Sequence, residues 1–72
     1  MLEIKTTFKK GILIISLGGE LVRETINNLD IIIDLIENNG FSNVLIETKV
    51  NYDKYGYKKL KHLKKMKNVL II

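Results

Sequence analysis

The chain begins with two segments whose apolar residues follow the period of β-strands. From Leu2 to Phe8, apolar and polar residues alternate, which is typical of a strand with one exposed face. Lys9-Lys10-Gly11 then predicts a hairpin turn, because glycine readily adopts the positive φ that tight turns require. Ile12 to Leu17 is almost continuously apolar, which predicts a central strand covered on both faces and ended by Gly18-Gly19.

The following segment changes to the period of an amphipathic helix. Its apolar residues recur at i, i+3, i+7 and i+10: Ile26, Leu29, Ile33 and Ile36. Glu24 or Thr25 is expected to cap the start of this helix, and Asn38-Asn39-Gly40 predicts its end. Ile31 and Leu35 widen the apolar stripe beyond what packing on one sheet requires, so contact with another helix or another chain is expected.

The second half of the chain predicts one more strand, helix and strand. Residues 43–48 form an apolar strand, and residues 52–56 form a polar turn. A helix over 58–67 and a final apolar strand over 68–72 follow. The order is therefore ββαβαβ in a single domain over residues 1–72. Alternation of strands and helices implies parallel pairing through right-handed crossovers, so the expected fold class is α/β: a mixed four-stranded sheet with two helices on one face.

The amino-acid composition indicates which class of protein this chain belongs to. A hydrophobic fraction of 46% with 28% charged residues is typical of a globular domain. The chain has no cysteine, which excludes disulfides, thiolate metal sites and a cysteine nucleophile. The absence of disulfides in such a small domain favours a location in the cytoplasm. The longest apolar runs are too short to cross a bilayer, and the N-terminus does not resemble a signal peptide, so no membrane association is expected.

Charge is distributed unevenly along the chain. Residues 1–53 contain all eight acidic residues and five basic ones, a formal charge of −3. Residues 54–72 contain seven lysines and no acid, a charge of +7, which accounts for the total of +4. Three explanations are open: pairing with the acidic first helix, contact with an acidic protein partner, or binding of nucleic acid.

Nucleic acid is a physically reasonable partner for this lysine-rich helix. Lysines can neutralise phosphates, and the tyrosines just before the helix can stack on single-stranded bases. No arginine accompanies them, so bidentate recognition of guanine is not expected. The candidate nucleic-acid-binding residues are Lys58, Lys61 and Lys65.

No catalytic or metal-binding constellation is visible in the sequence. His62, the only histidine, lies on the lysine-rich helix without a partner for general base catalysis or metal binding. Asp30, Asp34 and Glu37 share one side of the first helix, a pattern more typical of solvated carboxylates than of a divalent-ion site. Gly18-Gly19 fits neither common nucleotide-binding motif. We therefore predict a protein with no catalytic residues, no metal and no cofactor.

Several motifs resemble the STAS domain of anti-sigma-factor antagonists. Residues 11–21, which end in Gly-Glu-Leu, resemble the second strand of that family, and Thr25 falls where the family's first helix begins. Residues 40–46 resemble the end of the family's second helix and its third strand. The likeness covers nearly all of this chain, which corresponds to the front part of the family's domain, so the chain resembles a shortened and degenerate member.

The family's functional motif, Asp-Ser-Ser-Gly, is altered in this chain. Its counterpart is Asp53-Lys54-Tyr55-Gly56, in which both serines are replaced, including the serine that is phosphorylated in the family. The resemblance implies a regulatory protein-interaction module in bacteria that lacks the phosphorylatable serine. It also implies a partner-binding surface at Asp53, Lys54, Tyr55 and Gly56, facing an anti-sigma-like kinase or another regulator.

The predicted sheet leaves an apolar surface without a cover. Residues 12–17, 44–46 and 69–72 are apolar on both faces, yet two helices cover only one. Large exposed apolar patches usually mark interaction sites, so we expect a homodimer or another protein partner on the uncovered sheet or the last strand. The alternative function is that of a small basic nucleic-acid-binding protein that uses the lysine-rich second helix.

Overall fold

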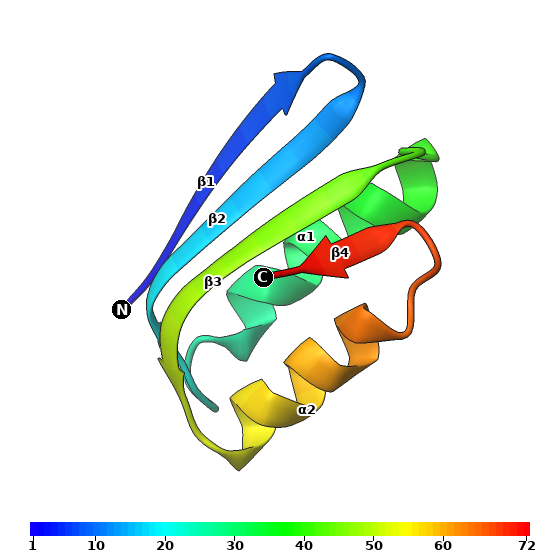
Figure 1. Ribbon diagram of the computed structural model, residues 1–72. Coiled ribbons are helices and arrows are strands. Elements are labelled where there is room, and N and C mark those ends of the chain that lie inside the picture. Colours follow the sequence, from blue (N-terminus) through cyan, green and yellow to red (C-terminus); the bar gives the residue numbers. More distant parts are fainter.

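The computed structural model describes residues 1–72 and has the element order ββαβαβ (Figure 1). The elements are β1 (Leu2–Lys9), β2 (Ile12–Leu21), α1 (Ile26–Asn39), β3 (Val44–Tyr52), α2 (Lys54–Lys64) and β4 (Val69–Ile71). The strands lie in the order β1-β2-β3-β4, with β1 antiparallel to β2 and the other neighbours parallel. Both helices pack on the same side of this sheet. The predicted α/β fold class, a mixed four-stranded sheet with two helices on one face, is confirmed.

A two-residue connection joins β1 to β2. Lys10 has a φ of 52° and Gly11 a φ of 80°, and positive φ at both positions matches the twist of the flanking strands. The register runs from Leu2 opposite Gly19 to Lys9 opposite Ile12. The hairpin predicted at this turn is therefore confirmed.

The central pair of strands is longer than the sequence pattern indicated. β2 pairs with β3 from Leu13 opposite Val44 to Leu21 opposite Tyr52. The prediction that Gly18-Gly19 ends the second strand is wrong, because β2 continues through both glycines. Glycine lacks a side chain to pack, but its backbone still pairs, here with β1 on one side and β3 on the other.

The core lies between the sheet and the two helices. Leu13, Ile15 and Leu17 of β2 are buried, whereas Ile12 and Ile14 stay partly exposed on the other face. The helices contribute the buried side chains of Leu29, Ile33, Ile36 and Leu63. The prediction that β2 is covered on both faces is wrong, because both helices lie on one side and nothing in the chain covers the other.

The second helix begins earlier and ends earlier than predicted. β3 extends to Tyr52 and α2 starts at Lys54, so residues 52–56 do not form the expected polar turn. The helix ends at Lys64 because the chain turns over the next four residues to enter β4 at Val69.

Two apolar residues of α1 remain exposed. Ile31 is 68% exposed and Leu35 is 41% exposed. The helix faces α2 through its other side, where Asp30 forms an ion pair with Lys59. The expected contact of Ile31 and Leu35 with another helix is therefore absent within the chain.

Candidate interaction surfaces

Asp53 fixes the start of α2. One oxygen of its carboxylate accepts hydrogen bonds from the backbone N–H groups of Tyr55 (3.0 Å) and Gly56 (2.9 Å). The other oxygen accepts a hydrogen bond from the backbone N–H of Arg23 at 3.1 Å. The side chain thus caps the helix and also ties it to the loop after β2, thirty residues earlier in the sequence.

These hydrogen bonds favour the charged form of the carboxylate. The N–H of Gly56, followed by those of Arg23 and Tyr55, holds the pKa of Asp53 below its ordinary value of 3.8, with partial desolvation acting in the opposite direction. Asp53 is consequently an anion at neutral pH, at the N-terminal end of a helix whose dipole favours negative charge.

Gly56 allows α2 to approach the end of β2. A Cβ atom at this position would lie 2.0 Å from the carbonyl oxygen of Leu21 and 2.9 Å from the Cβ of Tyr52. Only glycine therefore fits here without displacement of the helix or the strand.

Thr25 organises the loop that Asp53 contacts. Its hydroxyl donates to the carbonyl of Glu20 (2.7 Å) and accepts from the N–H of Val22 (2.9 Å). Thr25 is the residue before α1, but its side chain does not cap that helix. The hydroxyl instead closes the turn between β2 and α1, which holds Arg23 beside the start of α2.

Lys54 and Tyr55 form the part of the candidate site that a partner can reach. Lys54 is exposed and Tyr55 is half-buried. The Nζ of Lys54 lies 5.3 Å from the centre of the Tyr55 ring, and the guanidinium of Arg23 lies 5.8 Å from it. Of the four predicted partner-binding residues, Asp53 and Gly56 thus make internal contacts, while Lys54 and Tyr55 present a cationic, aromatic surface.

The outward face of α2 is entirely basic. Positions 54, 58, 61 and 65 share one side of the helix, so Lys54, Lys58, Lys61 and Lys65 project together away from the core. We call these four side chains the lysine ridge. It contains all three candidate nucleic-acid-binding residues, each of them exposed.

Internal pairing accounts for little of the positive charge. The Nζ of Lys59 lies 2.6 Å from the Asp30 carboxylate, and this is the one ion pair between the helices. The other six lysines of residues 54–72 have no carboxylate within ion-pair distance. Pairing with α1 therefore explains one lysine of seven.

A groove of about 450 Å³ separates the two helices. Asp30, Asp34 and Glu37 line it from α1, while Lys58 and His62 belong to the opposite wall. These acidic residues and the histidine do not come together as a group that could hold a metal ion. The groove therefore has an acidic wall on α1 and a basic wall on α2.

Two tyrosines that the sequence placed merely beside the lysines form a stacked pair. The ring centres of Tyr52 and Tyr57 are 6.2 Å apart with an interplanar angle of 28°. Both rings are about half exposed, and the Nζ of Lys61 lies 5.9 Å from the centre of the Tyr57 ring. Sequence reasoning missed this pair because the start of α2, which brings position 57 beside position 52, was placed too late.

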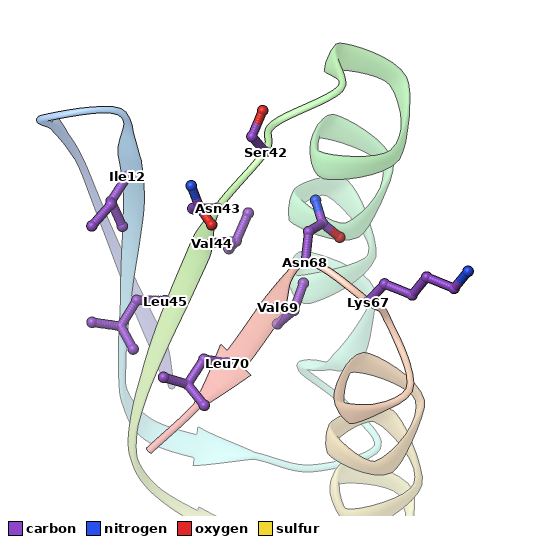
Figure 2. Close-up of a pocket in the computed structure, with 9 residues that line it drawn as sticks. All are labelled: Ile12, Ser42, Asn43, Val44, Leu45, Lys67, Asn68, Val69 and Leu70. Atoms are coloured by element: carbon purple, nitrogen blue, oxygen red, sulfur yellow. The ribbon is translucent and has the colours of Figure 1, made fainter.

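The face of the sheet without helices has an apolar surface. Ile14, Leu45 and Leu70 lie in one row across β2, β3 and β4, and Ile12 lies beside them. Figure 2 shows Ile12, Leu45 and Leu70 pointing to the same side, away from the helices. Together with residues at the start of β3 and β4, these three line a hollow of about 540 Å³. We call the side chains of Ile12, Ile14, Leu45 and Leu70 the open-face patch. Leu70 is 63% exposed, so the patch is accessible to a partner.

Comparison with known proteins gives no assignment: no protein-family model matches the chain, and no curated protein matches it. The helices themselves give one further observation, which is that neither is long and apolar enough to cross a membrane.

Proposed function

We propose that this chain is a non-catalytic interaction module that binds an acidic protein partner through the lysine ridge and Tyr55. The observation that supports this most directly is the set of unpaired lysines beside a rigidly capped helix start. Unpaired lysines on one helix face attract and orient an acidic surface, and the half-buried ring of Tyr55 offers an apolar anchor.

The proposed relationship to the STAS domain has support from the local geometry. Asp53 and Gly56, the two residues retained from the family's motif, are the two that fix the helix start against β2. Thr25, another residue of the resemblance, closes the neighbouring turn. In this proposal the chain is a regulatory module of the bacterial cytoplasm whose partner is an anti-sigma-like kinase or another regulator.

Regulation would differ from that of the family. Lys54 has no hydroxyl group and cannot accept the phosphate that the family's serine receives. A phosphate would bring about two negative charges to the helix start, whereas Lys54 brings a permanent positive charge. We therefore propose that binding at this surface is constitutive and depends on the charge of the partner.

A second candidate function is binding of single-stranded nucleic acid. The stacked and exposed rings of Tyr52 and Tyr57, beside the ammonium group of Lys61, favour it. Bases stack on such rings, and lysines neutralise the adjoining phosphates. The protein-binding proposal ranks first because the lysine ridge includes Lys54, which lies beside Tyr55 at the capped start of the helix.

Site-specific photo-crosslinking tests the proposal. A photoreactive phenylalanine analogue in place of Tyr55 should give a discrete protein adduct in cells. The same analogue in place of Phe8, an exposed aromatic residue on β1, serves as the matched control and should not give that adduct. Equal adducts from both positions would contradict a binding surface at α2.

Charge reversal then tests how the partner is recognised. Lys58→Glu with Lys65→Glu should abolish the adduct formed at Tyr55. The same change of charge at Lys9 and Lys10, both exposed at the hairpin, should leave it intact. An adduct that survives reversal of the ridge would show that its charge is not used.

A further inference from the structure

The face of the sheet without helices carries two rows of charged residues beside the open-face patch. Each row crosses β1, β2 and β3: Lys5, Ser16 and Glu47 form one, and Glu3, Gly18 and Lys49 form the next. Leu17 and Ile46, their neighbours along β2 and β3, are buried under the helices, so these rows point to the other side. We call them the charged rows. Each contains one basic and one acidic residue, and the signs are exchanged from one row to the next.

The four charges of these rows have no partner of opposite charge within the chain. None of them forms an ion pair. In each row the lysine and the glutamate belong to β1 and β3, which are two strand spacings or roughly 9–10 Å apart. The residue between them is small, and Ser16 donates a hydrogen bond to the Glu47 carboxylate at 3.0 Å. The charges are therefore available to a second surface, and one carboxylate is already held in place.

The alternation of signs is complementary to itself under a two-fold rotation. When two such sheets stack face to face, an axis parallel to β2 places β1 of each copy over β3 of the other. Lys5 then faces Glu47 of the second copy, and Glu3 faces Lys49 of the second copy. The open-face patches of the two copies lie at the same end of the interface, so apolar surface meets apolar surface.

The apolar residues exclude the other rotation that would match the charges. An axis across the strands would bring Lys5 over Glu3, and Glu47 over Lys49, of the second copy. It would also place the open-face patch over the polar end of the face, where Glu20 lies opposite Asn51. Polar groups buried under apolar side chains lose water without gaining hydrogen bonds. The charges and the patch together thus favour the axis along β2.

We propose that two copies of this chain associate face to face through the open side of the sheet, about a two-fold axis along β2, with the charged rows fixing their relative orientation. Stacked sheets lie about 10 Å apart, a distance that lysine and glutamate side chains from facing rows can span. The helices lie on the opposite side of the sheet (Figure 1), so dimerisation leaves the proposed partner site on α2 free.

Single charge reversals and their mixture test this arrangement by sedimentation velocity. Lys5→Glu and Glu47→Lys should each weaken the dimer about tenfold or more, because each places like charges opposite one another at two symmetric positions. An equimolar mixture of the two variants should form a heterodimer as tight as that of the wild type, since every facing pair again has opposite signs. Single variants that dimerise like the wild type, or a mixture as weak as the single variants, would overturn the proposal.

Two further variants separate this arrangement from other causes. Lys10→Glu makes the same change of charge at the hairpin turn, outside the charged rows, and should leave the dimer intact. An effect equal to that of Lys5→Glu would overturn the proposal, because the dimer would then respond to net charge alone. The double variant Lys5→Glu with Glu47→Lys is complementary only about the axis along β2, so it should dimerise like the wild type. A monomeric double variant that is folded by circular dichroism would overturn that axis.

Discussion

At the scale of single residues, Asp53 and Gly56 determine where the second helix starts. Both were predicted to bind a partner because the resemblance to the STAS domain grouped them with Lys54 and Tyr55. Asp53 contacts Arg23, thirty positions earlier in the sequence, and Gly56 packs against Leu21 at the end of β2. No local pattern predicts such contacts, so the motif could be recognised from the sequence but the roles of its residues could not.

Replacement of Gly56 should be strongly destabilising. In Gly56→Ala the new Cβ would lie 2.0 Å from the Leu21 carbonyl oxygen, so backbone must move. We expect a loss of about 3 kcal/mol in the free energy of unfolding, measured by urea denaturation. Gly18→Ala is the matched control, because its Cβ comes no closer than 3.9 Å to another residue and should change stability by less than about 0.5 kcal/mol. Similar losses in both variants would contradict the close packing described for Gly56.

The capping carboxylate predicts a pH dependence of stability. The pKa of Asp53 is lower in the folded state than its ordinary value of 3.8, so its charge stabilises the fold fully above that pH. This stabilisation is lost as the pH falls through the folded-state pKa. Asp53→Asn retains a capping oxygen but does not titrate, so the wild type should lose stability relative to this variant only below about pH 4. A constant difference between the two across the acid range would show that the carboxylate is not held in its charged form.

At the scale of helices and strands, hydrophobic periodicity predicted every element but not all of the element boundaries. The alternation of Leu2 to Phe8 and the helical spacing from Ile26 to Ile36 depend only on which face is buried, so both elements were predicted correctly. The errors in the predicted boundaries occur where contacts between distant parts of the chain determine where an element begins or ends. β2 continues past Gly18-Gly19 because strands on both sides pair with it, and α2 starts early because Asp53 caps it.

The ion pair between the helices should contribute little to stability. Asp30 and Lys59 are in direct contact, but their side chains are 41% and 32% exposed. We expect a coupling energy of no more than about 1 kcal/mol from a double-mutant cycle with Asp30→Ala and Lys59→Ala. This coupling should decrease at high salt. A larger value that is insensitive to salt would mean that the helix interface is more enclosed than the structure shows.

The whole molecule has helices on one side of the sheet and the open-face patch on the other. The apolar runs in the sequence predicted this exposed surface correctly, because both helices were expected on one face of the sheet and therefore leave the other face without a cover. The sequence could not predict which side chains form it, since that depends on the pairing register. Ile12 and Ile14 face outward because Leu13 and Ile15 face the helices.

We expect the open-face patch to drive self-association. Sedimentation velocity over a wide range of concentration should show a dimer that Leu70→Glu converts to a monomer, because the charge would be buried at the interface. Ile31→Glu is the matched control, since Ile31 is similarly exposed on the helical side and its replacement should leave the dimer intact. A wild-type chain that stays monomeric at high concentration would contradict this expectation.

The central claim is that the lysine ridge recognises a protein and not a phosphate backbone. The most direct test is fluorescence anisotropy of labelled single- and double-stranded oligonucleotides across a salt series. Phosphate contacts release counterions, so binding that depends on them falls steeply with salt. We predict no binding at physiological salt. Micromolar binding under those conditions, lost on charge reversal at Lys58, Lys61 and Lys65, would contradict the claim and identify the ridge as a nucleic-acid-binding surface.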